Sequence, residues 1–259
     1  MRANPVKQRL AEGGLAFGTM LFEFASPGIA RIAAGAGAEF LILDMEHSGW
    51  GFETVKQQVA AARAAGLVAL VNPPSGAFEN VGRCLDLGAQ GLMIPVVETR
   101  EQAEALVAAT RYPPLGHRGS AFGVAHDDYA PGDPAATMAR ANENVLLVVK
   151  IETAKGVANA DDILGVPGID VGFVGHTDLS VSLGMPGQFT RPEFIAARDA
   201  VVRACRRHGK AAGCFSPSVT AGKAWMAAGF RFVTYSGDIW IFAEAMKAGL
   251  DALKAAPPE

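Results

Sequence analysis

Eight short segments rich in β-branched or other apolar residues alternate along the chain with Ala-rich segments in which apolar residues recur at helical spacing. The eight segments are LAFGTML from Leu15, FLILDME from Phe40, LVALVNP from Leu67, GLMIPVV from Gly91, VLLVVKIE from Val145, VGFVG from Val171, KAAGCFS from Lys210 and RFVTYSG from Arg231. The Ala-rich segments often end on Gly, as helices do. Strand followed by helix, repeated eight times, predicts a closed parallel (β/α)8 or TIM barrel of the α/β class.

The main alternative to a barrel is an open, doubly wound sheet, but no GxGxxG motif follows the first predicted strand. A length of 259 residues also matches one barrel, so residues 1–259 are predicted to form a single domain. One connection is irregular, because the segment from Arg111 to Asn144 includes the Pro- and Gly-rich motifs YPPLGHRGS and DDYAPGDP. We expect this long loop to lie over an active site.

Composition and charge narrow the choice of partners. Half of the residues are hydrophobic and the formal net charge is −3, which argues against disorder and against a nucleic-acid-binding surface. No run of about 18 uninterrupted apolar residues occurs, so no membrane span is expected. The three cysteines form no CxxC motif, which disfavours a disulfide framework or a structural zinc and favours a reducing compartment. We therefore expect a cytoplasmic protein whose partners are small molecules and copies of itself.

The second predicted strand ends in Asp44-Met45-Glu46-His47. Barrel enzymes carry their catalytic groups at the carboxyl ends of the strands. Strand alternation places Asp44 and Glu46 on one side, with His47 at the rim. A carboxylate beside a histidine orients the imidazole and raises its basicity, which suits a general base. The alternative is a polar cluster that only caps the strand end.

Two further strand ends carry carboxylates that fit a metal site. The fifth strand ends in Lys150-Ile151-Glu152-Thr153, and the sixth in Gly175-His176-Thr177-Asp178 at the start of a predicted helix. Glu152 and Asp178 together suit a hard cation such as Mg²⁺ or Mn²⁺. The alternatives are a salt bridge between Glu152 and Lys150, and stabilisation of Asp178 by the helix N-terminus. The amides of Gly175–Thr177 would direct donors at a substrate carboxylate.

Several motifs, in this order, resemble the HpcH/HpaI aldolases. They are DxEH from Asp44, LDxGAQGxMxPxV from Leu85, RYPPxGxRG from Arg111, KIET from Lys150 and GxxDLSxxLG from Gly175. The resemblance covers nearly the whole chain. It implies a barrel of the phosphoenolpyruvate/pyruvate type and a homohexamer built from dimers that exchange their last helix.

The resemblance also implies roles for individual residues. Glu152 and Asp178 would hold Mg²⁺, Mn²⁺ or Co²⁺, which would chelate the keto and carboxylate oxygens of pyruvate. His47 would be the acid/base group, supported by Asp44 and Asp86. The metal would stabilise the enolate formed when the aldol bond breaks, without a lysine Schiff base.

By the same resemblance, the amides of Gly175–Thr177 would hold the pyruvate carboxylate. Arg118 in the GHRGS motif would lie in a loop near the site. An ion pair that orders the loop is the alternative for Arg118.

Three positions depart from the family pattern. The family commonly has Arg at the end of the third strand, where this chain has Asn72, and loss of one charge-assisted donor can reduce the rate on the order of 100-fold. Lys150 stands where the aldolases often have Gln, and our hypothesis is that its ammonium replaces the lost charge. His176 stands where the family usually has Pro, and it would bind metal, contact substrate or do neither.

The leading interpretation is a metal-dependent aldol lyase that reversibly cleaves a 4-hydroxy-2-oxo acid to pyruvate, or a related 2-oxo acid, and an aldehyde. Because of Asn72 and Lys150, a citrate lyase β-subunit-like or citrate synthase-like enzyme on the same fold remains an alternative function. A barrel that has lost turnover and only binds a ligand is a third possibility. Aromatic residues such as Phe22, Phe215 and Trp240 fit core packing or pocket walls better than a cofactor site.

Overall fold

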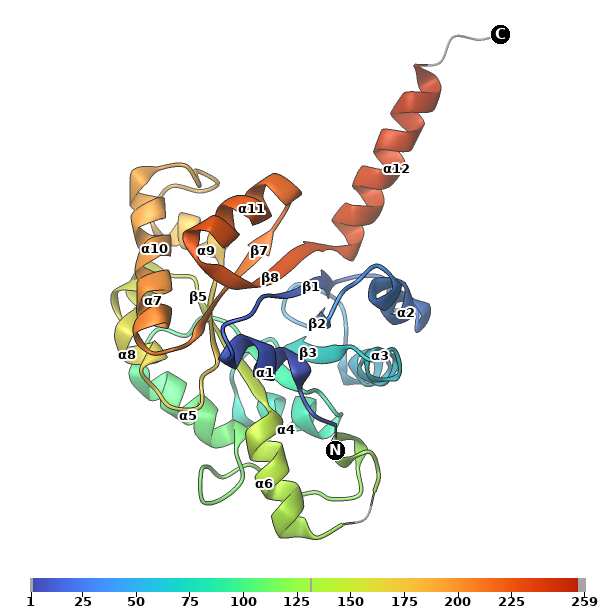
Figure 1. Ribbon diagram of the computed structural model, residues 1–259, viewed down its shortest axis with the longest axis vertical. Coiled ribbons are helices and arrows are strands. Elements are labelled where there is room, and N and C mark those ends of the chain that lie inside the picture. Colours follow the sequence, from blue (N-terminus) through green and yellow to red (C-terminus); the bar gives the residue numbers. More distant parts are fainter. Residues whose placement is uncertain (1, 131, 256–259) are drawn as a thin grey trace.

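The eight strands form a closed parallel barrel in which each strand pairs with the next and the last pairs with the first (Figure 1). This computed structural model describes residues 2–130 and 132–255. The strands are β1 Ala16–Leu21, β2 Phe40–Asp44, β3 Val68–Asn72, β4 Gly91–Ile94, β5 Leu146–Ile151, β6 Val171–Val174, β7 Ala211–Ser216 and β8 Phe230–Gly237. The predicted (β/α)8 barrel is confirmed, and each predicted strand segment overlaps the observed one.

Helices follow the strands, and most of them surround the outer face of the barrel (Figure 1). They are α1 Pro5–Ala11, α2 Gly28–Gly35, α3 Phe52–Ala64, α4 Phe78–Asp86, α5 Arg100–Thr110, the 3-10 turn η1 Ala125–Asp127, α6 Pro134–Asn144, α7 Ala154–Ala158, α8 Ala160–Leu164, α9 His176–Ser182, α10 Pro192–Arg207, α11 Val219–Ala228 and α12 Asp238–Lys254. Side-chain caps fix several helix starts. Thr99, for example, forms a capping box with Gln102 at the start of α5.

Two apolar layers hold the barrel together. Outward-facing strand residues such as Leu41 and Leu43 pack against helices. Inward-facing residues fill the barrel interior, where the rings of Phe40 and Phe232 stack with centroids 4.2 Å apart. Gly18 makes room for this stack, because a Cβ there would lie 2.5 Å from a carbon of the Phe40 ring. Strand alternation continues the inward-facing rows to the carboxyl ends of the strands.

The long connection between α5 and β5 does not lie over the carboxyl ends of the strands. Helix α5 runs from the carboxyl end of β4 back towards the amino end of β5, so the loop after it begins at the amino end of the barrel. The loop, η1 and α6 lead directly to Leu146, the first residue of β5. The expectation that this segment covers an active site is therefore wrong.

Helix α12 projects from the barrel instead of packing along it (Figure 1). Its first residue, Asp238, is buried, but the helix is exposed from Trp240 onward. Exposed apolar side chains on it are Trp240, Ile241, Phe242, Met246, Leu250 and Leu253. Among the described residues, no helix has the length and apolar character needed to cross a lipid bilayer.

Candidate active site

A cavity of about 480 Å³ opens at the carboxyl ends of the strands. Its lining residues are Met20, Phe22, Glu23, Asp44, His47, Asn72, Met93, Lys150, Glu152, Phe173, Gly175, His176, Thr177, Asp178, Phe215, Ile239 and Trp240. Of the eleven site residues predicted from the sequence, nine line this cavity, and Asp86 and Arg118 do not. Asp44, Asn72 and Lys150 continue the inward-facing rows of β2, β3 and β5.

Asp44 is fully buried at the end of β2, and both oxygens of its carboxylate accept hydrogen bonds. Its Oδ1 accepts a hydrogen bond from the backbone N–H of His47 at 2.6 Å, and its Oδ2 accepts one from Asn72 Nδ2 at 2.5 Å. Burial raises the pKa of the Asp44 carboxyl, although these donors oppose the shift. Asp44 thus shapes the turn that carries His47, whose side chain is 59% exposed at the rim. The carboxylate of Glu46 lies beside the imidazole, with 3.6 Å between Nε2 and Oε2.

Lys150 links the carboxylates of two strand ends. Its Nζ donates to Glu46 Oε2 at 2.5 Å and lies 3.4 Å from Glu152 Oε2. Burial acts to lower the pKa of Lys150, but the charges of Glu152 and Glu46 outweigh it and raise the pKa, so Lys150 is a cation. Asn72 Nδ2 also donates to Glu46 Oε2, at 3.0 Å. Glu46, which strand alternation placed beside Asp44 in the sequence analysis without a role of its own, is therefore a site residue.

Glu152 lines the cavity with a carboxylate of which one oxygen accepts no hydrogen bond. Its Oε1 accepts a hydrogen bond from the backbone N–H of Val96 at 2.7 Å, while its Oε2 is buried and accepts none. Burial raises the pKa of Glu152, and the negative charge of Asp178 adds to this, against the effect of Lys150. Gly175 packs directly on this side chain, since a Cβ there would lie 2.7 Å from Glu152 Cβ.

Val96 holds its N–H towards Glu152 with a strained backbone. Its φ is 53°, which is rare for a β-branched residue. Its side chain is half exposed, so packing of that side chain does not explain the conformation. The hydrogen bond to Glu152 is the contact that the strained backbone provides.

The carboxylates fit a divalent metal ion. Glu152 Oε2 lacks a hydrogen-bond donor, and the charge of Asp178 acts on the same carboxylate. Within residues 2–130 and 132–255, no three or more His, Cys, Asp or Glu side chains gather to hold a metal. A metal here would therefore have two protein carboxylates and would take its other ligands from substrate and water, as Mg²⁺ often does.

His176 belongs to a group of aromatic rings. Its imidazole stacks on Phe215, with centroids 5.8 Å apart and an interplanar angle of 13°, and contacts Phe189 at 4.9 Å. Burial lowers the pKa of His176, although Asp178 opposes this. The ring contacts give His176 a packing role beside the site.

Asp86 and Arg118 lie elsewhere in this chain, which corrects the expectation for both. Asp86 is the last residue of α4, and helices that follow barrel strands end near the amino ends of the strands. Arg118 Nη2 donates to Asp86 Oδ1 at 2.8 Å, and its guanidinium lies 4.7 Å from the centroid of the Tyr112 ring. The structure thus matches the alternative of an ion pair that orders the loop.

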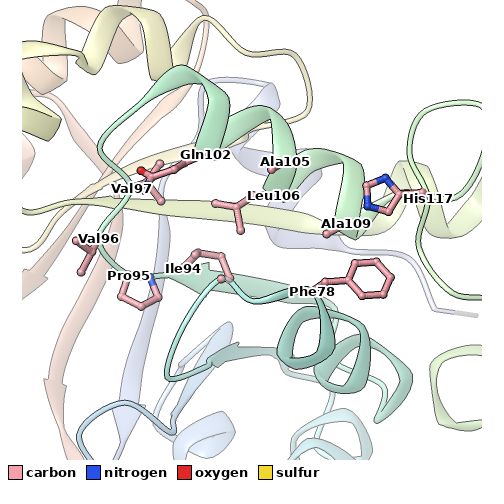
Figure 2. Close-up of a pocket in the computed structure, with 11 residues that line it drawn as sticks. Phe78, Ile94, Pro95, Val96, Val97, Gln102, Ala105, Leu106, Ala109 and His117 are labelled. Atoms are coloured by element: carbon pink, nitrogen blue, oxygen red, sulfur yellow. The ribbon is translucent and has the colours of Figure 1, made fainter.

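A second cavity, of about 360 Å³, lies outside the barrel between α4 and α5 (Figure 2). Its walls are mostly aliphatic, with Ile94 and Leu106 across the middle and Phe78 and His117 stacked at one end. No carboxylate lines it. The cavity at the strand ends is therefore the candidate active site.

Comparison with known proteins agrees with this geometry. The sequence profile of the family HpcH/HpaI aldolase/citrate lyase matches residues 19–245. The chain is 36% identical to the 2-keto-3-deoxy-L-rhamnonate aldolase of Salmonella dublin, over 98% of this chain and 94% of that protein. The crystal structure of the HpcH/HpaI aldolase from Desulfitobacterium hafniense DCB-2 matches with a TM-score of 0.92 and 34% identity, over 97% of both chains. That of citrate synthase SbnG matches with a TM-score of 0.85 and 27% identity, over 96% of this chain and 97% of that one.

The barrel with acidic groups at its strand ends and these similarities together define a carbon–carbon lyase of the class II aldolase type. The chain belongs to the HpcH/HpaI aldolase/citrate lyase family.

Proposed function

We propose that the chain reversibly cleaves a 4-hydroxy-2-oxo acid to pyruvate and an aldehyde with the help of a divalent metal. The observation that carries this proposal is the buried carboxylate of Glu152, which lines the cavity and whose Oε2 accepts no hydrogen bond, with the Lys150 ammonium 3.4 Å away. A buried carboxylate oxygen without a hydrogen bond is costly, and a bound cation would complete its environment. The name of the Salmonella relative, a 2-keto-3-deoxy acid aldolase, supports the same reaction type.

Glu152 and Asp178 would hold Mg²⁺, Mn²⁺ or Co²⁺. A bound metal would supply positive charge that stabilises the negative charge developing on the 2-oxo group as the C3–C4 bond breaks. The amides of Gly175–Thr177, at the start of α9, bind the substrate carboxylate. His47 at the rim takes the proton from the 4-hydroxyl group as the C3–C4 bond breaks and delivers it to C3 of the resulting enolate, which gives pyruvate; the same transfers run backwards in synthesis.

Lys150, and not Asn72, supplies the donor to the substrate oxygen. Asn72 Nδ2 carries two hydrogens, and both already donate, to Asp44 and to Glu46. The Lys150 ammonium has three donors, of which one is used by Glu46 and one faces Glu152. The third is free for the 2-oxo oxygen. Asn72 thus positions the carboxylates of Asp44 and Glu46. This role needs two N–H donors and no charge, which accounts for an uncharged residue at this strand end.

The test is exchange of the pyruvate methyl protons for deuterium, followed by NMR. We expect exchange with Mg²⁺ or Mn²⁺, none with EDTA, and strongly reduced exchange in His47→Ala. His117→Ala is the matched control, because His117 is also exposed but lies at the second cavity. Exchange that persists in EDTA would contradict the metal, and no exchange with bound metal would contradict pyruvate as the product.

A citrate-forming or citrate-cleaving reaction is the second candidate. Lys150 is the one Lys or Arg side chain among the residues that line the cavity. The positive charge of this site therefore comes from a lysine, whereas the aldolases of the family commonly use an arginine. The similarity to citrate synthase SbnG favours this alternative. Metal binding without pyruvate exchange would support it. Absence of metal binding would instead support a barrel that binds a ligand without turnover.

We also propose a homo-oligomer in which α12 packs on another copy, with a hexamer of helix-exchanging dimers as the specific form. Phe242, Met246, Leu250 and Leu253 are all exposed and form one apolar stripe at helical spacing. A projecting stripe of this kind needs a partner to cover it. Met246→Glu combined with Leu250→Glu should lower the oligomeric mass in light scattering, whereas the exposed Lys247→Glu should not.

The three buried free thiols support the reducing cytoplasm as the compartment.

A further inference from the structure

Four aromatic rings form one continuous wall of the cavity, here called the aromatic wall: Phe22, Trp240, Phe215 and His176. The ring centroids are 5.1 Å apart for Phe22 and Trp240, 5.6 Å for Trp240 and Phe215, and 5.8 Å for Phe215 and His176. All four residues line the cavity that contains the carboxylates. A ligand held by the acidic groups therefore extends along ring surfaces.

Two of the four rings, Phe22 and Trp240, come from separate elements that one buried carboxylate ties together. Asp238 accepts hydrogen bonds from the backbone N–H groups of Phe22 and Glu23 at 3.0 Å, Phe24 at 2.8 Å and Ile239 at 2.9 Å. These bonds fix the segment after β1 against the first turn of α12, which carries Trp240. The wall is thus positioned before a ligand binds, which reduces the entropic cost of binding.

Charge in the cavity disfavours an anionic ligand at the wall. The described lining residues include four carboxylates, from Glu23, Asp44, Glu152 and Asp178. The single lysine, Lys150, is already paired with Glu46. Lys150 and the proposed metal both serve the acid end of the substrate, so a second carboxylate would meet like charges. A polyhydroxylated chain would place hydroxyl groups against Phe22 and Phe215, which offer no hydrogen-bond partner, and the ring nitrogens of Trp240 and His176 are the polar atoms of the wall.

We propose that the aldehyde partner is a neutral aldehyde with an aromatic or similarly large apolar group, which packs on the aromatic wall. This inference rests on the proposed aldolase function. The acid end of the substrate occupies the polar end of the cavity, and the carbon skeleton beyond C4 lies against the rings. The cavity volume of about 480 Å³ is within the range of sites for small molecules of this size.

The test is aldol synthesis from pyruvate with four aldehydes: phenylacetaldehyde, acetaldehyde, lactaldehyde and succinic semialdehyde. We expect kcat/KM for phenylacetaldehyde to exceed that for acetaldehyde by about 10- to 100-fold, because burial of a phenyl group is worth about 1.5–3 kcal/mol. The values for lactaldehyde and succinic semialdehyde should also lie below that for phenylacetaldehyde. A preference for either of these two would overturn the proposal.

Variants of the wall give a second readout. Phe215→Ala and Trp240→Ala should each lower the ratio of kcat/KM for phenylacetaldehyde to that for acetaldehyde by about 10-fold. Phe215→Leu, which keeps the apolar volume, should lower the ratio too, so the test survives if the Ala variant does not fold. Phe78→Ala, an exposed ring at the second cavity, should keep the wild-type ratio. An unchanged ratio in both wall variants would overturn the proposal.

Failure of this inference and failure of the proposed function give different results. If the pyruvate methyl protons exchange but the enzyme prefers a charged or hydroxylated aldehyde, the aldolase function is supported and the proposal of an aromatic aldehyde is contradicted. Absence of pyruvate exchange with metal bound removes both.

Discussion

Substitution of Gly175 by Ala tests whether Glu152 is held in place for a metal. A Cβ at position 175 would overlap Glu152 Oε2 and lie 2.7 Å from Glu152 Cβ, whereas ordinary van der Waals contact begins near 3.4 Å. Either Glu152 or the start of α9 must therefore move by at least about 0.7 Å. Functional groups in sites tolerate about 0.5 Å of displacement. Gly175 has a φ of −76°, which Ala also adopts, so the effect comes from the contact and not from backbone strain.

We expect Gly175→Ala to weaken Mn²⁺ binding by about 10- to 100-fold, the range seen when a ligand's supporting contacts are lost. Isothermal titration with Mn²⁺ measures this directly, and thermal unfolding without metal checks that the variant folds. Gly82→Ala is the matched control, because a Cβ at that helical position meets no atom within 4 Å. Wild-type Mn²⁺ affinity in a folded Gly175→Ala protein would refute the assignment of Glu152 as a ligand.

Three further predictions concern charge and burial. Asp238→Ala should lower the free energy of unfolding by about 3 kcal/mol in urea denaturation, because four backbone donors lose their acceptor, while the exposed Asp251→Ala should change it little. Lys150→Gln should reduce turnover far more than Mn²⁺ affinity, and unchanged turnover would remove Lys150 as the oxyanion donor. Burial raises the pKa of the Cys84 and Cys205 thiols to about 12, so at pH 8 only about 1 in 10⁴ is thiolate and a thiol reagent should not label them in native protein. Rapid labelling before unfolding would contradict their burial.

The barrel was predictable because most strands are buried on both faces. Strands such as FLILD from Phe40 and LLVVKI from Leu146 are apolar until their carboxyl ends, at Asp44 and Lys150, and therefore stand out from the amphipathic helices. The candidate site followed from the same pattern. Where an apolar strand ends abruptly in Asp44 or Glu152, the alternation of side chains puts the polar group at the mouth of the barrel.

The partners of these residues were not predictable. The places of Asp86 and Arg118 did follow from the predicted order of strands and helices, because both lie at or after the end of a helix and therefore near the amino ends of the strands, whereas the resemblance to the family pointed to the site. The contact between Asp86 and Arg118 was not predictable. The joint contact of Asn72 and Lys150 with Glu46 depends on closure of the barrel, which brings side chains from different strands together.

Helix α12 serves two regions of the molecule. Its first turn contributes Trp240 to the aromatic wall and is fastened by Asp238, while its later turns project from the barrel. If those later turns are held by another copy, dilution that separates the copies would also loosen the wall. Substrate preference would then vary with enzyme concentration, and exchange of the C-terminal segment between relatives would alter assembly and selectivity in a single step.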